Sequence, residues 1–239
     1  MTDKFKKIIL LGRPASGKSE IIDYLKKSSP EDRLKRFHLG NIDEIDDFPM
    51  LWTWFEEDEI LEKKFGKPRM HSTKDGYFLF EYQWHVLIER ICLEYMKKTR
   101  DNKNYLDNTT CLIEFSRGTE HGGYKEAFKH LSREVLADAA LLYVNVPYEE
   151  SLRKNRKRFN PDKPDSILEH GLPDSKLERL YKEVDWNDID KSSTHINING
   201  IEVPYIVFEN MPSKTDDPKL LGPALDEVMG KLWEIYSGA

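Results

Sequence analysis

Continuous apolar runs, set between longer amphipathic stretches, form the main pattern along this chain. Four runs have the length of buried strands, at residues 7–11, 110–115, 139–146 and 203–210. Residues 36–39, which follow a Ser-Ser-Pro turn, are predicted as a further strand, the second along the chain. Apolar strands separated by helices are typical of a parallel sheet covered on both faces. We therefore expect an α/β fold with a central, mostly parallel sheet of five strands. The last strand should lie near an edge, because Pro204 lacks an amide donor.

Helical periodicity fills the segments between the strands. Ile21, Ile22 and Leu25 share one helical face directly after the first strand. Further helices are predicted at residues 78–98, 124–131, 149–158, 177–186 and 218–236. No internal repeat, low-complexity tract or linker divides the chain. Residues 1–239 are therefore expected to form a single domain.

The turn between the first strand and the first helix carries the most specific motif. It reads Gly12-Arg13-Pro14-Ala15-Ser16-Gly17-Lys18-Ser19 and matches G-x-x-x-x-G-K-[ST]. The glycines let the backbone N–H groups wrap around a phosphate, and the following helix adds the positive end of its dipole. Lys18 can reach the β- and γ-phosphates, and the Ser19 hydroxyl can coordinate Mg²⁺. A chance match is the alternative, but the strand and helix on either side favour a nucleoside triphosphate site.

Acidic residues gather just beyond the predicted second strand. Asp43, Glu44 and Asp46 lie where doubly wound sheets bind their ligands. An acid at this edge could activate a substrate hydroxyl or hold Mg²⁺ through water. A solvated acidic loop is the alternative interpretation.

The third strand also ends in candidate chemistry. Glu114 occupies the position where nucleotide sites place a metal-organising carboxylate, and Arg117, three residues on, could contact a transferring phosphoryl group. An ordinary salt bridge is the alternative for Glu114. His121, next to two glycines, is predicted as a loop residue.

Residues 48–98 are predicted as a helical substrate-binding segment rich in aromatic side chains. Trp52, Trp54 and Tyr82 could line a slot for a flat base, and the amide of Gln83 could read a base edge. The alternative is that these aromatics form the core of two amphipathic helices.

A basic helix precedes a Pro- and Asp-rich stretch, and together they are predicted as a lid at residues 149–175. Guanidinium groups bind phosphate oxygens two at a time, so Arg153, Arg156 and Arg158 are suited to closing on phosphates. A solvated basic face is the alternative.

Bulk composition excludes several classes of protein. The net charge of −6 argues against a general nucleic-acid-binding surface. Cys92 and Cys111 lack metal-type spacing, so neither a disulfide framework nor a zinc site is expected. No apolar run approaches the roughly 20 residues that span a bilayer, and the charged leader leaves no room for a signal peptide. We expect a cytoplasmic protein with no membrane partner. Its state is left open between a monomer and a homodimer.

Taken together, the loop, the acids and the lid resemble the P-loop kinases of the nucleoside and nucleoside-monophosphate kinase superfamily. The basic lid followed by Leu177-Glu178-Arg179-Leu180-Tyr181 is similar in style to deoxynucleoside kinases. The resemblance implies a three-layer α/β/α fold of the P-loop NTPase type, with ATP and Mg²⁺ as cofactors. It also implies that Asn210-Met211-Pro212 contacts the adenine. The chain departs from deoxynucleoside kinases after the third strand, where it reads Glu114-Phe115-Ser116-Arg117 instead of Glu-Arg-Ser. After the second strand, Asp43-Glu44-Ile45 replaces Glu-Pro.

The predicted activity is phosphoryl transfer from ATP to a small acceptor, with a nucleoside or nucleoside monophosphate as the leading acceptor class. Two alternatives stay open. One is a kinase of a non-nucleotide metabolite, and the other is a regulatory ATPase that acts through a conformational change.

Overall fold

A six-stranded sheet forms the middle layer of the computed structural model, which describes residues 3–158, 171–189 and 191–238. The strand order is β2-β3-β1-β4-β6-β5. All neighbouring pairs are parallel except β5 with β6. The strands are β1 (Lys7–Gly12), β2 (Asn41–Asp46), β3 (Thr109–Phe115), β4 (Ala139–Asn145), β5 (His195–Ile198) and β6 (Ile201–Glu209). The α/β class and the mostly parallel sheet are confirmed, while the count of five strands is wrong by one.

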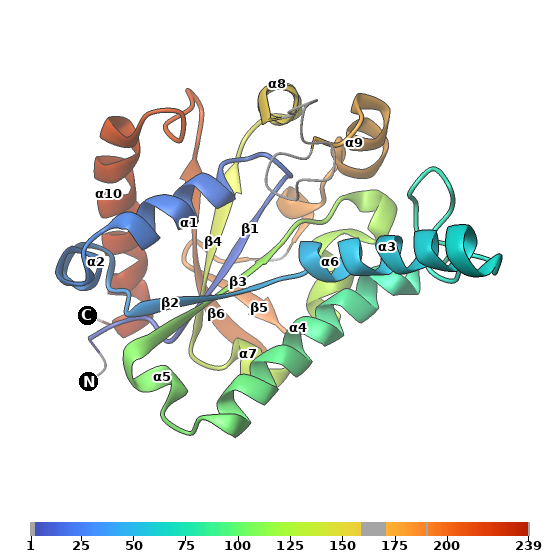
Figure 1. Ribbon diagram of the computed structural model, residues 1–239. Helices are drawn as coiled ribbons and strands as arrows, with labels where there is room; N and C mark the ends of the chain where they lie inside the picture. The colour runs from blue at the N-terminus through green and yellow to red at the C-terminus, as the bar shows by residue number, and fades with distance from the viewer. Residues whose placement is uncertain (1–2, 159–170, 190, 239) are drawn as a thin grey trace.

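Helices cover both faces of the sheet, as Figure 1 shows. One face packs against α1 (Lys18–Lys27), α2 (Pro30–Phe37) and α10 (Pro218–Ser237). The other packs against α4 (Tyr82–Asp101), α5 (Tyr105–Asn108), α6 (Gly123–Lys129) and α7 (Arg133–Leu136). The remaining helices are α3 (Phe48–Phe65), α8 (Tyr148–Arg158), α9 (Asp174–Tyr181), η1 (Thr119–His121) and η2 (Trp186–Asp188). This is the expected three-layer arrangement. Among the described helices, none has the length and apolar character needed to cross a membrane.

The prediction of a second strand at residues 36–39 is wrong, because this segment ends a helix. Ser29 caps α2 by accepting a hydrogen bond from Asp32 N, and Pro30 occupies the first turn. His38 then closes the helix in the left-handed region, at φ 52°. The strand begins only at Asn41, so the acids at 43, 44 and 46 lie within β2 itself.

An edge strand, β5, is absent from the predicted set. Asn199 and Gly200, both with positive φ, form the two-residue turn that pairs β5 with β6. The strand β6 is therefore second from the edge. Pro204 directly precedes the first residue of β6 that pairs with β4, so this ladder begins just after the residue that has no amide donor.

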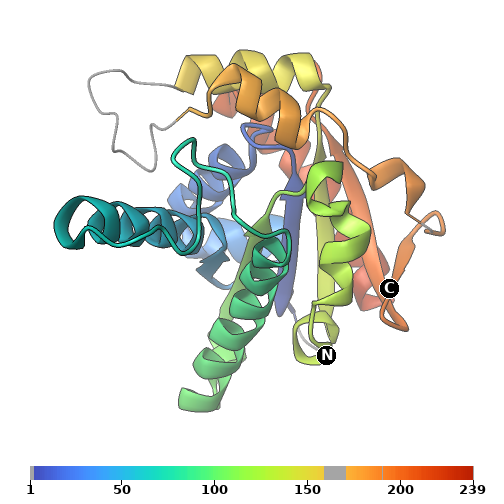
Figure 2. The ribbon, with the colours of Figure 1, turned by 90° about the vertical axis from the view of Figure 1, so that its right-hand side faces the viewer.

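The helix α3 projects from the body of the domain, and the loop that follows it folds back along its length (Figure 2). A fully buried carboxylate, Asp58, holds this loop. It accepts hydrogen bonds from the amides of Met70, His71 and Ser72, at 2.6, 3.0 and 2.6 Å, and from the Ser72 hydroxyl at 2.7 Å. Burial alone would raise the pKa of Asp58, but these donors outweigh it and the pKa is lowered.

We expect Asp58→Ala to release the loop after α3, because three backbone amides, that of Ser72 buried, lose their acceptor. The free energy of unfolding should fall by roughly 2–3 kcal/mol in urea titrations. Amide hydrogen exchange at residues 70–72 should accelerate. Glu59→Gln is the matched control, since Glu59 is an exposed neighbour that pairs only with Lys63 among the described residues. Unchanged exchange at residues 70–72 in Asp58→Ala would contradict this role.

Candidate active site

The phosphate-binding motif has the strand–loop–helix geometry that the sequence predicts. It starts at Gly12, the last residue of β1, and α1 begins at Lys18. Gly12 and Gly17 have φ of 152° and 113°, which favours glycine at both positions. A Cβ on Gly17 would also lie 2.8 Å from Asn210 Nδ2. The tight packing behind the loop therefore excludes any side chain at this position.

The Lys18 ammonium lies against the loop and is only 4% exposed. Its Nζ donates to the carbonyls of Gly12 and Arg13, at 3.2 and 3.0 Å, and to Ser116 Oγ at 2.9 Å. Glu114 Oε1 is 3.7 Å away. Lys18 and Glu114, both predicted as site residues, are thus close enough to form an ion pair beside the loop.

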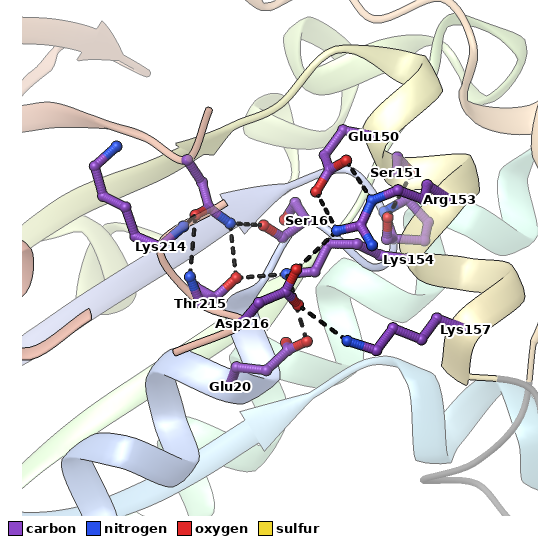
Figure 3. A network of polar contacts seen from close by, with 12 residues as sticks. Ser16, Glu20, Glu150, Ser151, Arg153, Lys154, Lys157, Lys214, Thr215 and Asp216 are labelled. Atoms are coloured by element: carbon purple, nitrogen blue, oxygen red, sulfur yellow. Dashed lines mark hydrogen bonds and ion pairs between the residues drawn. The ribbon is translucent and has the colours of Figure 1, made fainter. Parts of the chain in front are cut away.

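Asn210 supports the phosphate loop from behind. Its Nδ2 donates to Ser16 O and Thr215 Oγ1, both at 2.8 Å, and its Oδ1 accepts from Lys214 N at 2.7 Å. Figure 3 shows this corner, where the residues before α10 meet the loop and α8. Asn210, Met211 and Pro212, predicted as the adenine-contacting segment, do not line the cavity described below. The buried amide of Asn210 is already committed to the loop.

Arg13 ties the phosphate loop to the end of α9. Its guanidinium donates to the carbonyls of Val146, Tyr181 and Lys182, at 2.9, 3.1 and 3.1 Å. Pro14 O accepts from Ser151 Oγ at 2.7 Å. The side chain of Arg13 therefore braces the loop from outside the cavity.

Two carboxylates face each other where β2 and β3 end. Asp46 is the register partner of Glu114 across the two parallel strands. Burial, and after it the charges of Glu114 and Asp47, raise the pKa of Asp46 to about 8. Burial also raises the pKa of Glu114, although the Lys18 ammonium opposes the shift. A bound cation would relieve this repulsion, and oxygen ligands of this kind suit Mg²⁺.

The other two acids of β2 lie outside this group. Asp43 accepts from Tyr105 OH at 2.7 Å and pairs with Lys98 at 3.0 Å. Glu44 pairs with Lys26 on α1. Neither lines the cavity, whereas Asp46 and Asp47 both do. Of the three acids nominated on this strand, Asp46 alone therefore lies at the cavity.

Arg117 forms a buried ion pair instead of pointing freely toward a ligand. Its Nη1 donates to Asp47 Oδ2 at 2.6 Å, and its Nη2 donates to Trp84 O at 3.1 Å. His121, predicted as a loop residue, is buried in η1 with its ring stacked on Trp84 at 3.8 Å. Burial lowers the pKa of His121 to about 2, so the ring is neutral.

A cavity of about 580 Å³ extends from the phosphate loop to α3 and the loop after it. Its walls include Lys18, Ser19, Asp46, Glu114 and Arg117. An aromatic chamber, defined by Phe48, Trp52, Phe55, Phe78 and Trp84, forms its far part. Basic side chains from three elements also line it, namely Lys74, Arg158, Lys176 and Arg179. This volume lies within the usual range of small-molecule sites.

Of the four predicted substrate-binding residues, Trp52 lines the cavity. Trp54 stacks on His71 at 5.2 Å, and Tyr82 is 58% exposed. Gln83 is buried, and its Oε1 accepts from Phe80 N at 2.9 Å at the start of α4. The sequence analysis did not single out Phe55, Phe78 or Trp84, because a helical aromatic stripe does not tell core from cavity.

The roof of the cavity joins the loop after α3 to α9. Lys176 Nζ donates to the carbonyls of Asp75 and Gly76, at 2.6 and 3.2 Å. The Tyr77 ring lies beneath Lys176 Nζ at 5.0 Å and the Arg179 guanidinium at 4.6 Å. We call these two hydrogen bonds of Lys176 the roof clasp.

The three lid arginines separate into two kinds. Arg153 pairs with Glu150 and Asp216, and Arg156 pairs with Asp174, all outside the cavity. Arg158 lines the cavity. The predicted lid also includes residues 159–170, which lie outside the described part of the chain.

No family model matches the chain, and no curated protein matches it. Among solved structures, APE1195 aligns at 14% identity and a TM-score of 0.42, over 95% of this chain and 98% of that one. A sugar kinase from Janibacter sp. HTCC2649 aligns at 14% identity and 0.41, over 92% of both chains. A shikimate kinase from Acinetobacter baumannii, in complex with shikimate, aligns at 13% identity and 0.37, over 78% of both. These identities and TM-scores are too low to indicate the function of this chain.

The raised pKa of Asp46 predicts a pH-dependent stability. Between pH 3.8 and about 8, the carboxyl group of Asp46 is protonated in the folded chain and ionised in the unfolded chain. The free energy of unfolding should therefore fall as the pH rises from about 4 to about 8. Urea unfolding at pH 5 and pH 8 measures the decline. Asp46→Asn should remove most of this decline in the free energy of unfolding, while Asp43→Asn on the same strand should leave it in place. An equal decline in wild type and Asp46→Asn would refute the assignment.

Proposed function

We propose that this protein is a P-loop phosphotransferase that moves a phosphoryl group from ATP to a small acceptor. The observation that carries the proposal is the continuity of the cavity. Lys18 and Ser19 line one end of it, and the aromatic chamber forms the other. A donor phosphate held at the loop and an acceptor held in the chamber would therefore share one enclosed space, as direct transfer requires.

ATP with Mg²⁺ would supply the phosphoryl group and the metal charge when bound. The loop from Gly12 to Ser19 would hold the phosphates through its backbone N–H groups and Lys18. Ser19 and Glu114 would hold the metal, directly or through water. The donor set supports this role, because a hydroxyl and crowded carboxylates are hard oxygen ligands at one wall of the cavity.

Asp46 is the acid best placed to act on an acceptor hydroxyl. It lines the same cavity as Lys18, and its raised pKa lies near the working pH, where a general base is most effective. Asp43 and Glu44, the other two candidate acids of this strand, are engaged with Lys98, Tyr105 and Lys26. For an acceptor that is already a phosphate no base is needed, and Arg158 would neutralise charge instead.

The chamber favours a flat acceptor. Trp52, Phe55 and Trp84 offer ring faces and edges that suit a nucleobase, and the basic side chains nearby suit a phosphate. A nucleoside or nucleoside monophosphate therefore remains the leading class. Screening nucleosides, their monophosphates and hydroxylated metabolites for ATP consumption tests it. Turnover only with a metabolite would replace the acceptor class, and hydrolysis that no acceptor accelerates would favour the regulatory ATPase.

We expect Lys18→Ala to lower kcat by at least 10²–10³-fold, roughly the loss seen when one preorganised donor to transition-state charge is removed. Lys26→Ala, on the same helix, should keep full turnover because Lys26 pairs with Glu44 outside the cavity. Steady-state kinetics with far-UV circular dichroism separates lost catalysis from lost fold. Full turnover by a folded Lys18→Ala variant would rule the proposal out.

A second pair of variants identifies the base. For a hydroxyl acceptor, Asp46→Asn should lower kcat by roughly 10²–10⁴-fold, whereas Asp43→Asn should change it little. The comparison uses the acceptor found in the screen, at saturating ATP. Loss of kcat in Asp43→Asn alone would assign the role of base to Asp43 instead.

A further inference from the structure

Two helices on the face of the sheet opposite α1 each present an imidazole and a carboxylate one turn apart. His85 and Glu89 lie four residues apart on α4, and Glu126 and His130 lie four residues apart at α6 and its C-cap. Residues at this spacing share one helical face. The helices α4 and α6 run side by side in Figure 2, so the two pairs meet between them.

The meeting is close enough for a single ion. His85, Glu126 and His130 each offer one ligand atom, and these atoms all lie within 4.8 Å of one another. The two imidazole rings are nearly parallel, with centroids 4.7 Å apart and planes 10° apart. Because the stacked rings do not yet point their nitrogens at one centre, both side chains would have to rotate to bring the three atoms to the distance of about 2.0–2.2 Å that zinc requires.

A fourth side chain is placed to orient one of the imidazoles. Glu89 Oε1 lies 3.2 Å from His130 Nδ1. A carboxylate on the second ring nitrogen is the usual outer-shell partner of a metal-binding histidine, since it fixes the ring and raises its basicity. Glu89 and His130 therefore correspond to the carboxylate and the histidine of a carboxylate–histidine–metal arrangement.

The backbone leaves room for this cluster. Gly122 has φ 79°, and a Cβ there would lie 2.8 Å from Glu126 Cβ and 3.8 Å from His85 Cε1. The competing partner is Lys129, whose Nζ lies 2.6 Å from Glu126 Oε2. Lys129 is largely exposed and occupies one carboxylate oxygen, so an ion could still bind the other.

We propose that His85, Glu126 and His130 form a binding site for a transition-metal ion of the zinc class, with Glu89 as the orienting partner of His130. Two imidazoles and a carboxylate suit Zn²⁺, Co²⁺ or Ni²⁺, whereas Mg²⁺ prefers oxygen ligands alone. The site is separate from the acids at the phosphate loop. It does not depend on the proposed phosphotransfer.

An ion at this site would link α4 to α6. His85 follows Trp84, whose ring lines the cavity and whose carbonyl accepts from Arg117. Occupancy would therefore brace the wall of the aromatic chamber from behind. Metal binding to the folded chain alone also raises its unfolding temperature.

The test is a Zn²⁺ titration of the full chain after treatment with a chelator, followed by calorimetry and by competition with a chromogenic chelator. We expect one ion per chain that is lost in His85→Ala and His130→Ala. Glu126→Gln, which keeps the side-chain shape, should also weaken binding. Glu89→Gln should weaken it by about 10–100-fold, the usual effect of losing an outer-shell partner. Excess Mg²⁺ should not displace the ion.

His195→Ala is the matched control, because His195 lies on β5 and is not in the cluster. It should bind Zn²⁺ like the wild type. Thermal unfolding without metal identifies any variant that fails to fold, and Glu126→Gln keeps the proposal testable if an alanine variant does. Wild-type chain that binds no Zn²⁺ overturns the proposal. Binding that survives His85→Ala, His130→Ala and Glu126→Gln unchanged also overturns it, since the ion would then lie elsewhere.

Discussion

The buried ion pair between Arg117 and Asp47 determines how the walls of the cavity meet. Asp47 directly precedes α3, and Arg117 follows β3 by two residues. The same guanidinium reaches Trp84 O on α4. One cation therefore joins three segments that are distant in sequence. Removing one partner of a buried pair typically costs about 3–5 kcal/mol, because the other charge is left without compensation. The aromatic chamber depends on this electrostatic junction as much as on its own packing.

The sequence pattern was sufficient to predict the strands that are buried on both faces of the sheet. β1, β3 and β4 are buried on both faces, so their residues form continuous apolar runs that are visible in the sequence. The edge strand β2 reads Asn-Ile-Asp-Glu-Ile-Asp and has no such run. Two of its three acids, Glu44 and Asp43, pair with Lys26 and Lys98 from two helices, which sequence spacing does not reveal. The segment predicted as the second strand is the end of a capped amphipathic helix, α2. Phe37 and Leu39 are both buried there, and apolar residues at this spacing also fit a strand.

In the candidate site, too, the local motif could be predicted and the long-range contacts could not. The phosphate loop could be predicted because its chemistry lies within eight consecutive residues. The roles of Arg13 and Asn210 could not, since each is set by long-range partners, the carbonyls of Tyr181 and Ser16 respectively. Arg117 was predicted to contact a phosphoryl group, and it lines the cavity, but its ion pair with Asp47 is a tertiary contact that spacing does not reveal. The structure thus differs from the sequence-based prediction mainly because several of the predicted site residues bind other protein groups.

The roof clasp has a consequence for how an acceptor enters. Lys176 closes the roof by donating to two backbone carbonyls of the loop after α3, so the closure depends on side-chain bonds and not on sheet packing. Hydrogen bonds that involve a charged group contribute roughly 1.5–3 kcal/mol each. Opening therefore requires the loss of these bonds and of the contacts that Tyr77 makes with Arg179 and with the apolar cluster of α9, but not of any strand pairing. A motion of the roof would thus be local, since the phosphate loop is held by a separate set of bonds from Arg13 and Asn210.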